Sequence, residues 1–190
     1  MQHVSETTSP SDAIALLERT THALAFAPGP LPPMALRRIL EAGRLAPSLY
    51  NSQPVRFVAI RDRDAYERFR AACNKSRDTF VSGLERQLTG DVLPPHGYAI
   101  VTLQDDTLTE SVEACACALM AMQLEATAVG LASAFCSWTR GLSFQKDMVA
   151  MLGVPKGFKI FTSLVVGNPA APLVAAPKSR RAFDDAVTWI

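Results

Sequence analysis

The chain has 190 residues, of which 48% are hydrophobic, enough to build the core of one domain. Its 19 Lys and Arg residues balance 18 Asp and Glu residues, so the overall charge gives no argument for nucleic acid or an anionic membrane as a partner. No apolar run reaches the roughly 18 residues that a membrane helix needs, and the N-terminus lacks the pattern of a signal peptide. We therefore expect one cytoplasmic domain spanning residues 1–190, with a loose start at 1–11.

The first half of the chain predicts two helices, a strand and a long polar helix. A short helical signal lies within residues 12–26, and a second helix begins near Pro32 and stops at Pro47. Residues 55–60, VRFVAI, are rich in β-branched and aromatic side chains and predict a strand. Residues 64–88 form a charged helical stretch, which we expect to be a solvated surface or a lid.

The second half predicts two strands, two helices between them, and an arm. Residues 98–103 and 158–167 have the composition of strands. An amphipathic helix is predicted over 143–152, ended by a glycine with a proline just beyond it. Residues 168–190 lack core periodicity until their end, so we expect an extended arm that lies on other structure.

A long helix over residues 110–131 is the most unusual element. From Ala114 to Met122 it is apolar on every side, so it must be covered all round. It is either the centre of the domain or the centre of a subunit interface, and in so short a chain we favour a dimer.

The cysteines and histidines predict neither a disulfide framework nor a metal site. No cysteine pair has CxxC spacing, and three dispersed histidines cannot supply a histidine cluster. We expect the thiols to be reduced and buried as small hydrophobic groups. The cysteines are Cys73, Cys115, Cys117 and Cys136.

The segment RLAPSLYNSQPVRF, residues 44–57, places hydroxyl and amide side chains between Pro47 and Pro54. A stiff loop of this kind is able to hydrogen-bond the edge of a planar heterocycle. The alternative is a tight turn whose Asn and Ser side chains satisfy their own backbone.

A second polar signal is KSRR at residues 178–181, where three cations fall within four residues. Grouped cations are able to hold a phosphate, although such a fragment is more often simply solvated. Together the two signals suggest a ligand with a heterocycle at one end and a phosphate at the other. GxGxxG and GxxxxGK[ST] patterns are absent from the sequence, which disfavours Rossmann and P-loop nucleotide binding.

The order of these segments resembles the nitroreductase family of FMN-dependent oxidoreductases. The resemblance runs from about residue 12 to the C-terminus, and rests on APSLYNSQPVRF, the Gly130-Leu131 helix end, VVGNP and KSRR. It implies an α+β fold with a central, mostly antiparallel sheet between helices, in an intertwined homodimer with two FMN sites at the subunit interface. The arm at 168–190 is then expected to pack on the partner subunit.

The resemblance also assigns residues to the flavin. Pro47, Ser48 and Leu49 are expected to line it, and Asn51 to reach its pyrimidine edge, while Gln53 braces the loop through its amide. Lys178 and Arg180 match the positions that hold the FMN phosphate, with Arg181 a less certain partner. A metal site and a catalytic side-chain acid or base are not expected.

The N-terminal arm departs from the family, which usually has an RRSxR-like pattern before a Phe where this chain has ERTTHALAF. When the family pattern is aligned on Phe26 without a gap, its first two arginines fall on Thr20 and Thr21. Its last arginine falls on Leu24. With a one-residue shift, Arg19 and Thr21 take over the Arg and Ser roles and Ala23 stands at the other cation position. We prefer the shift, because Arg19 otherwise has no evident role. Each lost charge-assisted bond to the phosphate costs roughly 1.5 to 3 kcal/mol.

A second departure follows the long helix, where the family has small residues whose backbone N–H faces flavin N5. Here Ser137 and Trp138 fall nearest that position, and Trp138 either stacks by the isoalloxazine or is a core or interface residue. Arg140 is better explained as a surface residue than as a substrate ligand.

The implied activity is hydride transfer from NADH or NADPH through flavin N5 to a small oxidised acceptor, such as a nitroaromatic or a quinone, by a ping-pong mechanism. Two alternatives remain open. One is an oxidase that passes the electrons to oxygen, and the other is a flavin-binding or flavin-free dimer of the same fold without turnover.

Overall fold

The computed structural model describes residues 11–81, 91–173, 180 and 182–188 of the chain. Its helices are α1 (Ser11–Arg19), α2 (Ala35–Arg44), α3 (Arg63–Val81), α4 (Ser111–Ala128), α5 (Lys146–Met151) and α6 (Phe183–Ala186), with two 3-10 helices, η1 (Leu49–Asn51) and η2 (Ser137–Phe144). Its strands are β1 (Phe26–Ala27), β2 (Val55–Ile60), β3 (Tyr98–Asp105), β4 (Ala132–Cys136) and β5 (Phe158–Pro169).

The strands form one antiparallel sheet with β5 at its centre. β5 pairs along one edge with β3, which pairs in turn with β2, and along its other edge with β4 and with β1 at its end. The register shifts once, between Thr102 and Leu103. Because β5 is the central strand and helices cover both faces of the sheet, its residues 160–167 are all buried, which explains the mostly apolar run IFTSLVVG in the sequence.

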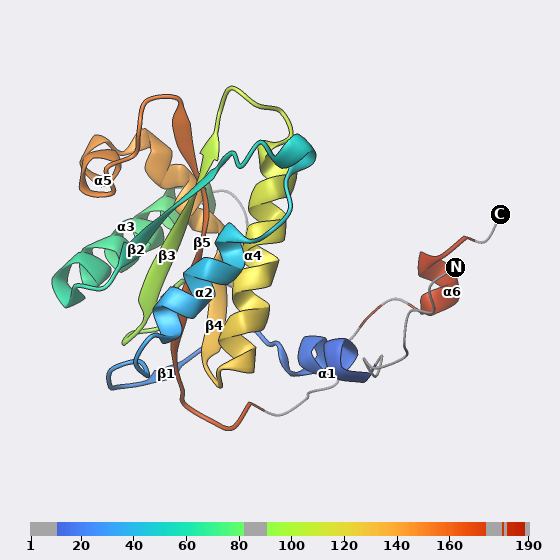
Figure 1. The fold of residues 1–190 in the computed structure, drawn as a ribbon. Coiled ribbons are helices and arrows are strands. Elements are labelled where there is room, and N and C mark those ends of the chain that lie inside the picture. The colour runs from blue at the N-terminus through green and yellow to red at the C-terminus, as the bar shows by residue number, and fades with distance from the viewer. Residues whose placement is uncertain (1–10, 82–90, 174–179, 181, 189–190) are drawn as a thin grey trace.

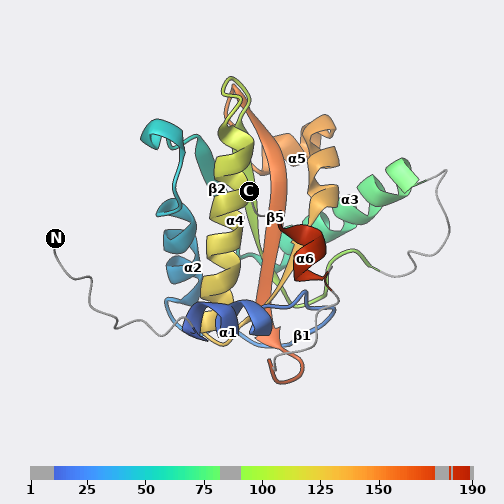
Figure 2. The ribbon, with the colours of Figure 1, turned by 90° about the vertical axis from the view of Figure 1, so that its right-hand side faces the viewer.

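Helices cover both faces of this sheet (Figures 1 and 2). Alternate strand residues point to opposite faces, so Ile100 joins α2 and α4 in one core while Val101 joins α3, η2 and α5 in the other. The α+β fold with a mostly antiparallel sheet between helices is therefore confirmed.

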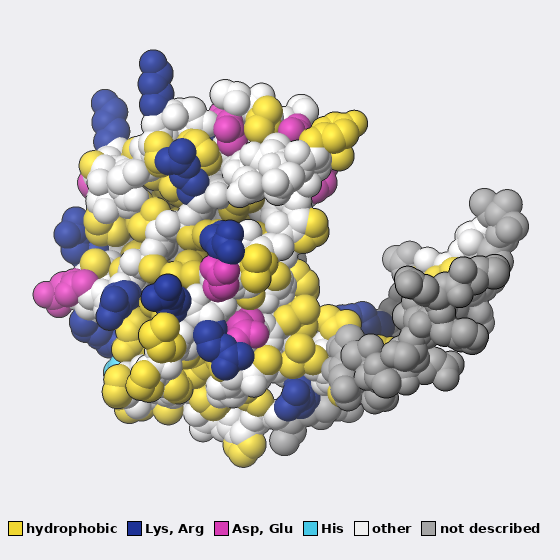
Figure 3. All heavy atoms as spheres, viewed as in Figure 1, with side chains coloured by type: hydrophobic (Ala, Val, Ile, Leu, Met, Phe, Trp, Pro, Cys, Tyr) yellow, Lys and Arg dark blue, Asp and Glu magenta, His cyan; other side chains and the backbone are white. Residues whose placement is uncertain are grey.

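The long helix α4 packs one side on the sheet and α2, and leaves the other side open. Its buried side carries Cys115, Leu119 and Met122, whereas Val112 and Cys117 are exposed. Three of the four free thiols are buried as expected, and the expectation is wrong for Cys117. Hydrophobic side chains reach the surface along this helix in Figure 3. The fold of a single chain therefore explains the apolar residues on the buried side of α4, but not those on its open side.

Three expectations about the elements need correction. The 132–136 strand and the two-residue β1 were not predicted, because each is short and draws its regularity from pairing with β5. The helix predicted over 143–152 begins only at Lys146, after the 3-10 turns of η2, and Phe144 is 84% exposed rather than on an apolar face. The helix expected over 64–88 is described as far as Val81, and the expectation of a solvated surface or a lid is wrong for it, because Tyr66, Phe69 and Cys73 are buried in the core.

Candidate functional site

The loop between α2 and β2 is held rigidly by its own backbone. The Asn51 N–H donates to the Ser48 carbonyl and the Ser52 N–H to the Leu49 carbonyl, each at 3.0 Å. The Gln53 backbone N–H donates to the Ser48 hydroxyl, also at 3.0 Å. The expected brace joined the Gln53 side-chain amide to neighbouring backbone, whereas this bond joins the Gln53 main chain to the Ser48 side chain.

Three non-glycine residues of this loop have positive φ. They are Tyr50 (φ 50°), Asn51 (φ 55°) and Gln53 (φ 48°). Asn tolerates this left-handed region, but for Tyr and Gln it costs of the order of 1–3 kcal/mol each. Strain of this kind concentrates in binding loops, so the loop is shaped for something other than chain reversal.

A hollow of about 150 Å³ separates the loop from α4. It is lined on the loop side by Pro47 and Ser48 and on the helix side by Ala114 and Ala118, whose small side chains leave the space open. The sequence signal for this wall was the small-residue run ACACA of α4. The sequence of the loop did not by itself indicate that α4 forms the facing wall.

The N-terminal arm, residues 19–23, lies at the opposite end of α4. Thr20 is buried, and its hydroxyl donates to the Leu16 carbonyl at 2.8 Å and lies 3.1 Å from the Thr127 hydroxyl oxygen. Its two neighbours are more accessible, with Arg19 exposed and Thr21 half-buried. Thr20 is therefore bonded within its own chain, whereas the Arg19 and Thr21 side chains are accessible.

Ser137 and Trp138 follow β4 on the sheet face opposite α4. Ser137 is exposed, and Trp138 is half-buried and packs against the α3–η2–α5 core. The buried Ser76 of α3 donates its hydroxyl to the Trp138 carbonyl at 2.8 Å. No sequence motif predicts this contact. Arg140 is exposed, as expected, with its Nε bonded to the Phe161 carbonyl and its guanidinium 4.6 Å from the Phe161 ring centre.

Replacing Ser76 by Ala should loosen this junction. The Trp138 carbonyl would lose its buried donor, which costs about 1 kcal/mol in the free energy of unfolding. Chemical denaturation at fixed protein and FMN concentrations measures the loss. Thr79→Ala is the matched control, because the Thr79 hydroxyl bonds back to Lys75 of its own helix on an exposed face. An equal effect of the two substitutions would contradict the anchoring role of Ser76.

Two buried thiols stand behind this junction. Cys136, which precedes Ser137, is hydrogen-bonded by the thiol of Cys73 and by Thr139, and these bonds lower the pKa of Cys136 below its ordinary value. The same contact with Cys136, together with burial, raises the pKa of Cys73 well above its ordinary value. The contact between the two thiols links α3 to the residue that precedes η2.

The C-terminal cations are described only in part. Arg180 is exposed, while Lys178 and Arg181 lie outside the described residues. The exposure of Arg180 is compatible with the expected phosphate contact and does not test it.

One chain does not bring all these residues together. The loop adjoins α4 at Ala114 and Ala118, whereas the arm contacts Thr127, which at about 1.5 Å per residue is roughly 14 to 20 Å further along the helix. Figures 1 and 2 both place α1 and the teal segment near residue 50 at opposite ends of α4. Ser137 and Trp138 are on the other side of the sheet. The hollow beside the loop therefore accounts for only part of the expected flavin site.

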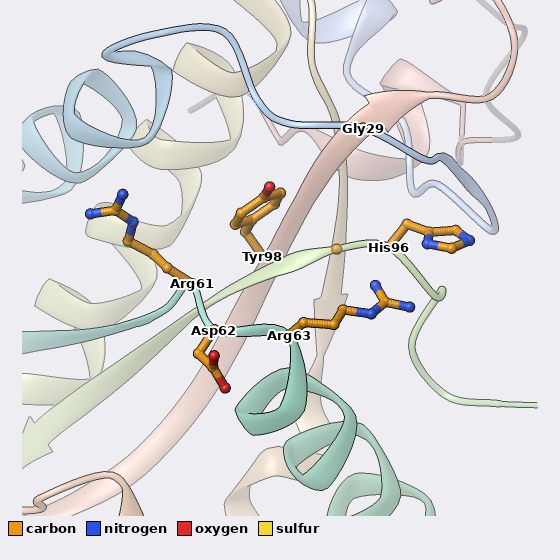
Figure 4. Close-up of a pocket in the computed structure, with 7 residues that line it drawn as sticks. Gly29, Arg61, Asp62, Arg63, His96 and Tyr98 are labelled. Atoms are coloured by element: carbon orange, nitrogen blue, oxygen red, sulfur yellow. The ribbon is translucent and has the colours of Figure 1, made fainter.

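A second cavity of about 300 Å³ lies where β2 ends and β3 begins (Figure 4). Arg63 extends toward His96, while Arg61 and Asp62 point to other sides. Asp62 accepts the Ala65 N–H at 2.8 Å and Arg63 pairs with Glu67 at 2.9 Å, so these charges are used to start α3. They do not converge on a ligand.

Among the described residues, no helix is long and apolar enough to cross a membrane. The same part of the chain holds no group of three His, Cys, Asp or Glu side chains placed to bind a metal ion.

Comparison with known proteins places this geometry in a family. Residues 16–168 match the nitroreductase family. A protein from Archaeoglobus fulgidus, named as an NADH dehydrogenase/NAD(P)H nitroreductase, is 28% identical over 139 residues, which cover 70% of this chain and 72% of that protein. The chain belongs to the nitroreductase family.

Solved structures share the fold. A nitroreductase with bound FMN from Bacteroides fragilis superposes with a TM-score of 0.76 at 23% identity, covering 94% of this chain and 98% of that one. A nitroreductase with bound FMN from Desulfitobacterium hafniense gives a TM-score of 0.77 at 19% identity, with 93% and 97% covered. The fold implied by the sequence resemblance is confirmed.

Proposed function

We propose that this chain is an FMN-dependent oxidoreductase, which takes a hydride from NADH or NADPH and passes the electrons to a small oxidised acceptor such as a nitroaromatic or a quinone. The observation that carries the proposal is the rigid, strained loop at 47–54 in a chain of the nitroreductase family. The FMN bound in the solved relatives supports the cofactor.

The donor set of the chain fits FMN. The Ser48 and Asn51 side chains offer a hydroxyl and an amide for the polar edge of a pyrimidine, with Pro47 and Leu49 beside them. Arg19, Thr21, Lys178 and Arg180 offer cations and a hydroxyl for the phosphate. Bound FMN supplies hydride acceptance from the nicotinamide and its later delivery to the acceptor.

The chain's own contribution is placement and charge. The loop presents its polar groups with little freedom to lose on binding, because its backbone is already bonded internally. Backbone N–H groups at Ser137 or Trp138 are proposed to face flavin N5, supported by the Ser76 anchor on the Trp138 carbonyl. Cations near the ring would stabilise the negative charge that reduction brings. A side-chain acid or base is not required.

We propose that two copies of the chain build each site. The loop and the arm lie at opposite ends of α4, and Ser137 with Trp138 lies behind the sheet, so a second subunit must bring the missing walls. The exposed apolar side of α4 supports a homodimer, because a large unpartnered apolar helix face favours association. Residues 168–190 are proposed to act as an arm packed on the partner, within a single domain over 1–190.

The four cysteines are all free thiols, which supports our proposal of a cytoplasmic location.

The turnover experiment uses the FMN-loaded protein, first without oxygen and then in air. NADH or NADPH oxidation is followed with p-benzoquinone or a nitrobenzene derivative as the acceptor. Parallel lines in double-reciprocal plots are expected, because the nicotinamide must leave before the acceptor enters. Nicotinamide oxidation that requires oxygen, with peroxide as product, would support the oxidase instead. Bound FMN without turnover in either gas would support the non-catalytic dimer.

A further inference from the structure

Tyr50 is the most exposed large hydrophobic residue among those described. Its side chain is 95% exposed, so it makes almost no contact with its own chain. Its backbone nevertheless holds φ 50° and ψ 24°, a left-handed conformation that a tyrosine rarely adopts. A fully solvated tyrosine on a floppy loop would need no such conformation, because glycine or asparagine would take it at lower cost.

The loop fixes where this ring projects. The hydrogen bonds of Asn51 to Ser48 and of Ser52 to Leu49 close the turn immediately around Tyr50. The bond from Gln53 to the Ser48 hydroxyl closes it a second time, and Pro47 and Pro54 stiffen both ends. Tyr50 is therefore an exposed aromatic ring on a rigid support, which is the arrangement of a preformed contact residue.

Its chain neighbours are the residues that the proposed function places on the flavin. Leu49 and Asn51 each lie one Cα step, about 3.8 Å, from Tyr50. If both line the isoalloxazine, the Tyr50 ring reaches the space directly beside it, where nicotinamide and acceptor must alternate. Because the ring is not packed on its own chain, it is free to stack on a planar molecule.

We propose that Tyr50 contacts the acceptor and determines its specificity, by stacking its ring on a planar aromatic acceptor next to the flavin. Its hydroxyl is available to donate to a nitro or quinone oxygen. This inference rests on the proposed function and names a selectivity that the function alone does not require. Acceptors that are neither flat nor aromatic gain nothing from the ring.

The test compares Tyr50→Ala, Tyr50→Phe and Tyr50→Trp in the FMN-loaded protein. Steady-state constants are measured for p-benzoquinone and, as a non-aromatic acceptor, ferricyanide. Tyr50→Ala should raise the KM for the quinone about tenfold, the value that loss of one aromatic pair implies. It should leave the KM for ferricyanide unchanged, and kcat for ferricyanide within about twofold.

The conservative variants separate stacking from hydrogen bonding. Tyr50→Trp should keep the KM for the quinone close to the wild-type value. Tyr50→Phe should give a KM between those of the wild type and Tyr50→Ala, because it keeps the stacking and loses the hydroxyl. Leu45→Ala is the matched control, since Leu45 is 67% exposed next to the same loop and has no role in the proposal. It should behave as the wild-type protein toward both acceptors.

The outcomes are distinct from those of the proposed function. FMN content and anaerobic reduction by NADH or NADPH are measured first in the wild-type protein, and their absence overturns both proposals. If the wild-type protein turns over and Tyr50→Ala shifts both acceptors alike, or neither, the role of Tyr50 is overturned while the oxidoreductase stands.

Discussion

Two variants of this protein that bind FMN poorly should recover FMN binding and activity when they share a dimer. The first, Asn51→Asp, places a carboxylate where the loop is proposed to meet the polar edge of the flavin, and aspartate tolerates the left-handed backbone at that position. The second combines Lys178→Glu with Arg180→Glu and removes the proposed phosphate cations. Each change should lower FMN affinity at least about tenfold, through lost or reversed charge-assisted bonds.

The recovery follows from symmetry. In a mixed dimer, one site receives both defects and the other receives none, if each site takes its loop from one subunit and its cations from the other. Random assortment of equal amounts should therefore give about a quarter of the wild-type activity and of the tightly bound FMN. Co-expression with two affinity tags isolates the mixed dimers. A mixture no better than the average of its parents would show that each site is built within one chain.

The largest loss of stability is expected for Gly97→Ala. A methyl group built on Gly97 would lie 2.6 Å from the Tyr66 hydroxyl oxygen and still closer to a Val165 methyl. Both neighbours are fully buried, and the Tyr66 hydroxyl donates to the Pro94 carbonyl at 2.6 Å. Burial raises the pKa of Tyr66 far above its ordinary value, so the hydroxyl keeps its proton and needs that acceptor. Overpacking and the displaced bond together should lower the free energy of unfolding by about 3 kcal/mol.

Gly43→Ala is the control for this effect. Its added methyl would lie 2.8 to 2.9 Å from the flexible side chain of Met122 and 3.0 Å from the edge of the Phe57 ring. Met adapts its rotamer readily, and replacing glycine by alanine within a helix gains up to about 1 kcal/mol, so the loss of stability should be smaller than for Gly97→Ala. Denaturation is followed at fixed protein and FMN concentrations, since ligand and partner both shift stability. Equal losses for the two variants would contradict the account of the packing around Gly97.

Sequence reasoning succeeded where the residue pattern itself decides the structure. The strand over 55–60 matches β2 in full, because a run of β-branched and aromatic residues between two turns has few other solutions. The helix expected over 110–131 is present as α4, although a single chain covers only one of its sides. The polar loop at 47–54 was located by its prolines, although its positive φ angles were not visible in the sequence.

Sequence reasoning failed where contacts between residues far apart in the chain decide the structure. β4 is a strand because five residues pair with β5, and η2 is a 3-10 segment because its residues pack between α3 and β5. The Ser76 anchor on Trp138 joins residues 62 positions apart, and no local signal marks it. The separation of the loop from the arm along α4 likewise depends on tertiary packing, and this separation is what points to a second subunit.

The most direct test of the central claim is the absorption spectrum of the purified protein, recorded anaerobically before and after addition of NADH and then of NADPH. We expect a flavin spectrum, FMN as the released chromophore, and loss of the visible absorption with at least one of the two nicotinamides. A colourless protein that leaves added FMN unbound, or a bound flavin that neither nicotinamide reduces, would contradict the account.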